Sequence, residues 1–207
     1  MSMTETTAYR SISVLLAGAV WLVAAIALGA SGMPQRLQAP VPQLILLGLT
    51  GLLLLATFRL PRLRAWAYEI DARWLVALHL SRFVGFYFLA LYGRGELSQA
   101  FAVTAGWGDN IVAGLALLLL LLGPPTSKSR WPLYVIWNVI GLADILFVVA
   151  TAAVTGTTDP LSMRALLKLP LSLLPTFLVP LIIASHVLLF ARLARIRKGV
   201  AARAKAA

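Results

Sequence analysis

The sequence of 207 residues contains no cysteine and only two histidines. The lack of cysteine excludes disulfide bonds, thiolate metal ligands, cysteine-ligated iron–sulfur clusters and haem attached through a CxxCH motif. Charged residues are also scarce, at 12% of the chain, whereas soluble domains average about 25%. Together with 60% apolar residues and a mean hydropathy of +0.89, these deficits indicate a protein that lies mainly in lipid.

The sequence also lacks motifs of known chemistry. No GxSxG, HExxH, Walker or dinucleotide-binding pattern occurs in it. Ser185 and His186 are adjacent, and neighbouring helix residues point about 100° apart, so they cannot act together as nucleophile and base. The sequence therefore favours a protein that is not an enzyme. A zinc-dependent intramembrane hydrolase is the enzymatic alternative.

Long apolar runs predict six membrane-spanning helices. A hydrocarbon layer of about 30 Å requires roughly 20 apolar residues in a helix, where each backbone group is paired within its own segment. Glycine and proline residues separate the runs, as in Gly123-Pro124-Pro125 after the fourth. The predicted spans are residues 12–30, 41–58, 73–93, 101–122, 132–154 and 170–191. We expect one all-α transmembrane domain over residues 1–207, ending in a basic tail at 192–207.

The first predicted span also resembles a secretory signal. Arg10 precedes an apolar run from Val14 to Leu28, and small residues follow at 30–32. Glu5 lies in the leader, which argues against cleavage. We therefore expect a retained helix, with a cleaved signal as the alternative.

The basic residues are distributed unevenly between the two sides of the predicted bundle. Thirteen of the 18 Lys and Arg residues fall on the side of the termini and four on the other, while Arg82 lies inside a span. The positive-inside rule then predicts cytoplasmic termini. Although the net charge is +11, we expect no nucleic-acid binding, because these residues flank helices where anionic headgroups lie and no nucleic-acid fold motif accompanies them.

Polar residues inside the predicted spans are the candidate functional residues, since ionisable groups at membrane depth are costly unless they are paired or hydrated. The rise of about 1.5 Å per residue of helix places the two histidines at one depth and Arg82 near Asp144. We expect Arg82 to pair with Asp144, Asp109 or both. The full set is His79, Arg82, Asp109, Asn110, Asn138, Asp144 and His186.

Helical spacing predicts which faces point inward. His79, Arg82, Phe83 and Phe86 follow an i, i+3, i+4, i+7 pattern on the third span. On the fifth span, Trp137, Gly141, Asp144 and Val148 do the same, and the glycine allows close approach beside the carboxylate.

Two interpretations of the charged residues remain open. In one, they form a buried ion pair that fixes helix register, because loss of one partner of such a pair is costly even without a further role. In the other, they line a polar cavity in which an aspartate titrates or binds a small solute or cation.

The histidines allow a similar choice. Two imidazoles at one depth on two helices suit a b-type haem held between His79 and His186. A zinc site with an aspartate is a second alternative, although zinc needs three or four ligands. The simpler interpretation is that both histidines hydrogen-bond to neighbouring groups.

Two further segments are unusual. Within residues 94–110, Gly106-Trp107-Gly108 precedes Asp109, and this stretch favours either a break in the helix at membrane depth or a tight extracytoplasmic hairpin with Glu96 exposed. Pro175 and Pro180 in the sixth span free the carbonyls of Leu171 and Thr176. These carbonyls either line a polar surface or mark a simple kink.

Two segments are predicted to lie at the membrane surface. Residues 59–72 mix arginines with Trp66 and Tyr68, which predicts an anchoring belt, with a partner-docking site as the alternative. Residues 161–168 are expected to form a short interfacial helix.

Several stretches resemble bacterial multi-pass membrane proteins of uncharacterised activity. They are Arg82-Phe83-Val84-Gly85-Phe86-Tyr87-Phe88-Leu89, Gly95-Glu96-Leu97, Phe101-Ala102, Ala105-Gly106-Trp107-Gly108-Asp109 and Pro175-Thr176-Phe177-Leu178-Val179-Pro180. This resemblance covers about half of the chain and implies a bacterial cytoplasmic (inner) membrane. It implies no activity.

These observations lead to three functional hypotheses. The first is a small-solute or ion-handling binding or transport protein that uses Arg82, Asp109 and Asp144. The second is a membrane electron carrier with b-type haem. The third is a structural or assembly partner of a membrane complex, acting through the basic and aromatic segment. The bilayer is the expected partner in each, and both a homo-oligomer and a separate membrane partner remain open.

Overall fold

A computed structural model describes residues 3–127 and 129–206, with side chains for residues 11–127 and 129–197. These residues form helices and connecting loops, without a strand. The side chains of Arg10, Lys128, Lys198, Arg203 and Lys205, which entered the charge comparison, lie outside the described residues.

Six helices of the described chain are long and apolar enough to cross a membrane, which confirms the predicted all-α class and the number of such helices. The third of these six helices, Ala72–Gly93, consists of three consecutive helical elements. The helical elements are α1 (Met3–Ala30), η1 (Met33–Arg36), α2 (Val41–Arg59), α3 (Pro61–Glu69), α4 (Ala72–Ala77), η2 (Leu78–Phe83), α5 (Val84–Gly93), α6 (Gln99–Leu122), α7 (Arg130–Thr158), η3 (Arg164–Leu167), η4 (Leu174–Leu178) and α8 (Val179–Ala206).

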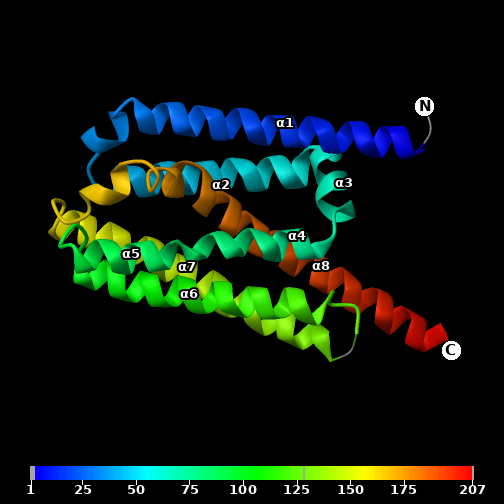
Figure 1. Cartoon of the computed structure of the whole chain (residues 1–207). Helices are drawn as coiled ribbons and strands as arrows, with labels where there is room; N and C mark the ends of the chain where they lie inside the picture. Colours follow the sequence, from blue (N-terminus) through cyan, green and yellow to red (C-terminus); the bar gives the residue numbers. More distant parts are fainter. Residues whose placement is uncertain (1–2, 128, 207) are drawn as a thin grey trace.

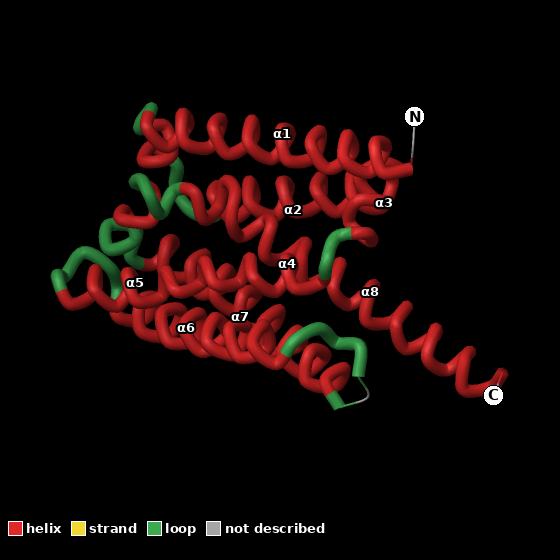
Figure 2. Tube along the Cα trace, turned by 45° about the vertical axis from the view of Figure 1, so that its right-hand side comes forward, coloured by secondary structure: helices red, strands yellow, loops and turns green. Residues whose placement is uncertain are grey.

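Both ends of the chain lie at the same end of the bundle, which we call the termini end (Figure 1). The short helix α3 and the α6–α7 loop lie there too, while η1, η3 and the α5–α6 loop form the opposite end (Figure 1). Helix α6 packs against α4, η2 and α5 on one side and against α7 on the other, and α8 packs between α2 and α7. The tube view shows α1 running along the edge of the bundle (Figure 2).

Four predicted boundaries differ from the structure by four residues or more. The first helix begins at Met3 rather than at residue 12. The fifth helix continues beyond residue 154 to Thr158. The sixth begins at Leu174 rather than 170, because residues 170–172 form turns. It also continues through the predicted tail as part of α8, since residues 192–206 are good helix formers that follow without a break.

The predicted break at Gly106-Trp107-Gly108 is wrong, whereas the alternative, a tight hairpin with Glu96 exposed, is confirmed. Helix α6 is continuous from Gln99 to Leu122, and the turn lies earlier, at Gly95 with φ +73°. The glycines serve packing instead. A Cβ at Gly106 would lie 2.9 Å from the carbonyl oxygen of Gly85, so α5 and α6 cross at a distance that only glycine permits.

The irregular backbone lies in the third segment. Residues Leu78–Phe83 form a 3₁₀-helix, with three residues per turn. The inward face therefore repeats every three residues, as His79, Arg82, Gly85 and Phe88, all buried. The predicted inward position of Phe86 is wrong, because its side chain is 56% exposed.

The sixth segment starts with a π-helical turn, η4, that contains Pro175. Pro180 has no N–H to donate to the Thr176 carbonyl. Trp21 of α1 donates its indole N–H to this carbonyl at 3.0 Å, and its ring packs against Phe177. The freed carbonyl thus attaches α1 to the bundle.

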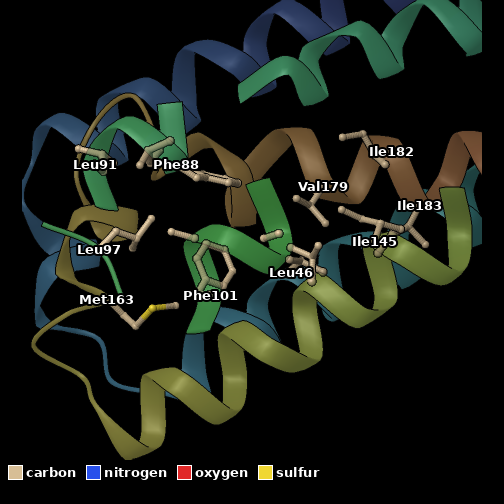
Figure 3. Close-up of a cluster of buried hydrophobic side chains, with 14 residues drawn as sticks. Leu46, Phe88, Leu91, Leu97, Phe101, Ile145, Met163, Val179, Ile182 and Ile183 are labelled. Carbon is tan, nitrogen blue, oxygen red and sulfur yellow. The ribbon is translucent and has the colours of Figure 1, made fainter. Parts of the chain in front are cut away.

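The apolar core has two parts, and a layer of polar side chains separates them. This polar layer consists of His79, Arg82, Asp109, Asn110, Asn138, Asp144, Ser185 and His186. One part lies toward the opposite end and includes Phe88, Phe101, Ile145 and Val179, which point toward one another in Figure 3. The other lies toward the termini end and includes Val76, Tyr134, Trp137 and Leu189. Along each of α6, α7 and α8, the residues of the polar layer lie between the residues of one apolar part and those of the other.

The predicted basic and aromatic segment contacts the last helix. Arg195 lies over the Tyr68 ring, 3.6 Å from its centroid, and Arg192 donates to the carbonyls of Ala67 and Ile70. At the opposite end, the predicted helix over 161–168 is shorter, as the 3₁₀-turn η3.

Candidate functional site

Arg82 is the centre of the polar layer. Its guanidinium donates from Nε to Asp109 Oδ1 at 2.7 Å, from Nη1 to the Gly141 carbonyl at 3.0 Å, and from Nη2 to Asp144 Oδ2. The side chain is 1% exposed. One residue of η2 therefore links α6 to two successive turns of α7, and the structure brings together the three charged residues that the sequence predicted.

The two carboxylates occupy different surroundings. The Asp109 side chain is 5% exposed, whereas that of Asp144 is 18% exposed. Asp144 lies against Gly108 of α6, where a Cβ would collide with the carboxylate oxygen. Glycine at 108 thus allows the α7 carboxylate to approach α6 and reach Arg82.

The charges of the layer do not balance. One guanidinium faces two carboxylates, so the cluster has a formal charge of −1 when both are ionised. A net charge inside a membrane protein is costly, and such groups are usually paired or hydrated. No other ion pair occurs among the described side chains of the layer. With both carboxylates ionised, one negative charge of the cluster has no counter-charge among these side chains.

The histidines form a second group next to Arg82, on the side of the termini. Their ring centroids are 4.2 Å apart, and Trp137 packs against both rings. A Cβ at Gly141 would lie 2.7 Å from His186 Cε1. Since the Gly141 carbonyl accepts from Arg82, this one backbone position contacts both groups.

Hydrogen bonds define the tautomer of each neutral histidine. Ser185 gives its hydroxyl hydrogen to the Ile182 carbonyl, so His79 Nε2 must donate to Ser185 Oγ, at 2.9 Å. Asn138 donates its amide to the His186 carbonyl, so its oxygen accepts from His186 Nδ1 at 2.7 Å. The remaining nitrogens, His79 Nδ1 and His186 Nε2, carry lone pairs and have no hydrogen-bond partner in the described chain.

This arrangement does not fit the predicted haem or zinc. Imidazole rings 4.2 Å apart leave no room for a macrocycle between them, and Ser185 already occupies His79 Nε2. Among the described residues, no group of three or more His, Asp or Glu side chains is placed to hold a metal ion. The hydrogen-bonded interpretation describes both histidines best.

The two predicted asparagines have separate surroundings. Asn138 holds the backbone and ring of His186. Asn110 packs against Gly85, where a Cβ would lie 2.8 Å from its Oδ1. Its amide is buried without a protein partner and makes no hydrogen bond to the Arg82 cluster.

A cavity of about 530 Å³ leads to the ionic cluster from the opposite end of the bundle. Its inner end is lined by Ser81, Arg82 and Asp109, and Asp144 does not line it. Apolar residues such as Leu46, Phe88 and Val148 line the middle of the cavity. Exposed residues of the opposite end, including Gln35, Arg36, Gln38, Pro160, Leu161 and Arg164, line its outer end.

Sequence reasoning missed several members of this site. Ser185 and the Gly141 carbonyl carry no pattern that marks them as partners of a histidine or an arginine. Arg36 and Arg164 were counted only as loop charges, because their convergence on one cavity depends on contact between η1 and η3. The clearest available signal was the glycine beside an aspartate of a predicted span, at Gly108.

A family model described as a domain of unknown function (DUF8737) matches residues 39–194, so the chain belongs to this family. The match covers every residue of the polar layer and leaves α1 outside it. No curated protein and no solved structure matches the chain.

Proposed function

We propose that the protein is a membrane-embedded binding or transport protein for a small solute, and that its Arg82–Asp109–Asp144 cluster holds a proton or another small cation. The observation that carries this proposal is the shared guanidinium at the inner end of an open cavity. A solute that enters the cavity reaches the one carboxylate that lines it, Asp109.

The charge of the cluster supports the ionic part of the proposal. Arg82 neutralises one of its two carboxylates, and the second needs a counter-charge in a low-dielectric interior. A proton provides this charge without occupying space, and a small cation can replace it. Asp109 faces the cavity, whereas Asp144 is partly exposed outside it. A proton or cation can therefore reach the cluster through the cavity at Asp109 or from outside the cavity at Asp144.

We further propose a bacterial cytoplasmic membrane with the termini in the cytoplasm. The bias of basic residues toward the termini end supports this orientation. The cavity then opens on the extracytoplasmic side, and a solute is received from there.

The test measures the protonated carboxyl group directly. In a lipid nanodisc at pH 7, in buffer without alkali cations, the wild-type protein should show the infrared carbonyl band of one protonated carboxylic acid. Asp144→Asn should remove this band, because Arg82 and Asp109 then form a balanced pair. Asp109→Asn should do the same by leaving a balanced pair with Asp144. In proteoliposomes, both variants should also lose any pH-dependent binding or flux of the wild type.

Glu96→Gln is the matched control, because Glu96 is an exposed carboxylate of the α5–α6 loop. It should leave the protonated-acid band unchanged. A wild-type protein without this band in cation-free buffer, or a band that persists in both Asp variants, would overturn the proposal.

The main alternative is that the ion pairs have a purely structural role. The hypothesis of a structural or assembly partner of a membrane complex makes the same prediction. Both predict that the two Asp variants change stability alone, with no loss of a protonated acid. Arg192 and Arg195 of the last helix already contact the basic and aromatic segment around α3. These contacts within the chain argue against this segment as a free docking site for a partner.

A further inference from the structure

We propose that the cavity binds a single-chain anionic amphiphile, with its phosphate or carboxylate head between Arg36 and Arg164 and its chain along the apolar wall. The inference rests on the proposed function only in taking the cavity as a binding site. It adds the chemical class of the ligand.

The outer end of the cavity has the chemistry of an anion site. Arg36 ends η1 and Arg164 begins η3, and these two short helices contact each other while both arginines line the cavity. Neither guanidinium has an ion-pair partner within the described part of the chain. Arginine offers a planar set of donors that suits phosphate and carboxylate groups.

The neighbouring side chains reinforce this preference. Gln35 and Gln38 add uncharged amide donors at the same end. Asp109 is the one acidic residue among the lining side chains, and it lies at the inner end in contact with Arg82. An anionic head at the outer end therefore meets two positive charges and no nearby carboxylate of the lining.

The middle of the cavity has the chemistry of an alkyl-chain site. Between the arginines and the inner end, the wall consists largely of side chains without polar atoms, contributed by α2, α5, α7, η3 and α8, with Gln43 of α2 as the exception. The apolar side chains include Leu46, Phe88, Val148, Ala152, Leu166 and Ile182. A free inorganic anion would leave this wall unused, whereas an alkyl chain fills it.

The volume and the position of the cavity restrict the class of ligand further. A volume of about 530 Å³ lies within the range of about 300–1,000 Å³ for small-molecule sites, which suits one short alkyl chain better than a two-chain lipid. The exposed arginines flank a helix end, where headgroups of a surrounding bilayer would lie. An amphiphile can thus enter with its head already at the correct depth.

The experiment uses the full chain in nanodiscs of zwitterionic lipid, with 11-(dansylamino)undecanoate as a single-chain fluorescent probe. Emission above that of empty nanodiscs should saturate with probe concentration. Dodecyl phosphate should displace the probe, whereas dodecyl maltoside should displace it at least tenfold less well. Inorganic phosphate at the same concentration should have no effect.

Two pairs of variants test the two ends of the ligand separately. Arg36→Gln combined with Arg164→Gln should weaken probe binding at least tenfold, whereas Arg94→Gln should not, because Arg94 is exposed at the same end but lies outside the cavity. Ala152→Phe should abolish saturable binding by filling the cavity. Val154→Phe should leave binding intact, because Val154 on the same helix is 64% exposed.

The outcomes separate this inference from the proposed function. Probe emission equal to that of empty nanodiscs would overturn the amphiphile, and so would equal displacement by inorganic phosphate, which would indicate a free-anion site. Equal binding by the arginine variants would overturn the head position. The infrared band of the protonated acid should persist in all four variants. A negative result in the amphiphile experiment would therefore not contradict the proposed proton or cation site.

Discussion

The two halves of the bundle differ in how their interior is filled. Toward the termini end, Tyr134 and Trp137 fill the space among α4, α6, α7 and α8, and both donate hydrogen bonds to backbone carbonyls of the α6 segment and its end. Toward the opposite end, an apolar cluster without buried Tyr or Trp side chains surrounds a cavity of about 530 Å³. The polar layer lies between the halves, so a ligand can approach it from one end.

This difference shows that apolar composition alone does not produce a solid interior. The closed half has aromatic rings with polar edges, which bind to backbone groups and fix their orientation. The open half is lined largely by aliphatic side chains and by a helix that begins with a π-turn, a feature often found at functional sites. Three predictions test the comparison.

The largest effect on stability is expected from Arg82→Leu, which removes the central charge of the polar layer between the halves. Two carboxylates would remain buried or partly buried without a counter-charge, and we expect a loss of about 3–5 kcal/mol in the free energy of unfolding. Unfolding in mixed detergent micelles, followed by circular dichroism, measures it. The triple variant with Asp109→Asn and Asp144→Asn should recover much of the loss. A stable single variant would contradict the importance of the ion pairs.

An intermediate effect is expected from the same substitution made in each half. Ala116 in the closed half is 0% exposed, so Ala116→Phe overpacks it and should cost about 1–3 kcal/mol or more. Ala152 lines the cavity, so Ala152→Phe should change the free energy of unfolding by less than about 0.5 kcal/mol. Equal losses for both variants would mean that the open half is as tightly filled as the closed half.

The smallest effect is expected at the edge of the open half. Trp21→Phe keeps an aromatic ring against Phe177 but removes the hydrogen bond to the Thr176 carbonyl. We expect a loss of about 1 kcal/mol, measured as a lower midpoint of thermal unfolding. Trp74→Phe is the control, because Trp74 is 72% exposed. An unchanged midpoint for both would show that this hydrogen bond does not hold α1 to the bundle.

Much of the fold was predictable because apolar runs of this length are expected to span a bilayer, which would restrict them to helices, and the number of runs then gives the number of helices. The approach of Arg82 to both aspartates followed from depth alone, since three charged groups near one level have few other partners. The inward face of the third segment was predicted correctly for His79 and Arg82 but not beyond them, because nothing in Leu78–Phe83 distinguishes a 3₁₀-helix from an α-helix. The change from 3.6 to three residues per turn exposed Phe86 and turned Gly85 inward.

The function of the glycines was predictable only in part. Gly141 was expected to allow close approach, and it contacts both histidine and arginine groups. Gly106 and Gly108 were interpreted as helix breakers, but each lies inside α6 and faces a neighbouring helix. Sequence alone does not distinguish these roles, because in a membrane helix a glycine can mark either a turn or a close contact.

The three-way hydrogen bonding of Arg82 also limits how this bundle can move. Its planar group bonds at once to Asp109, Gly141 and Asp144, so α6 and α7 cannot slide or rotate past each other without breaking a directional bond. Lysine, with one compact ammonium on a flexible stem, would not hold both helices in this register. Any opening that admits or releases a molecule is therefore left to the elements that carry no such clamp: η1, η3 and the start of the last helix.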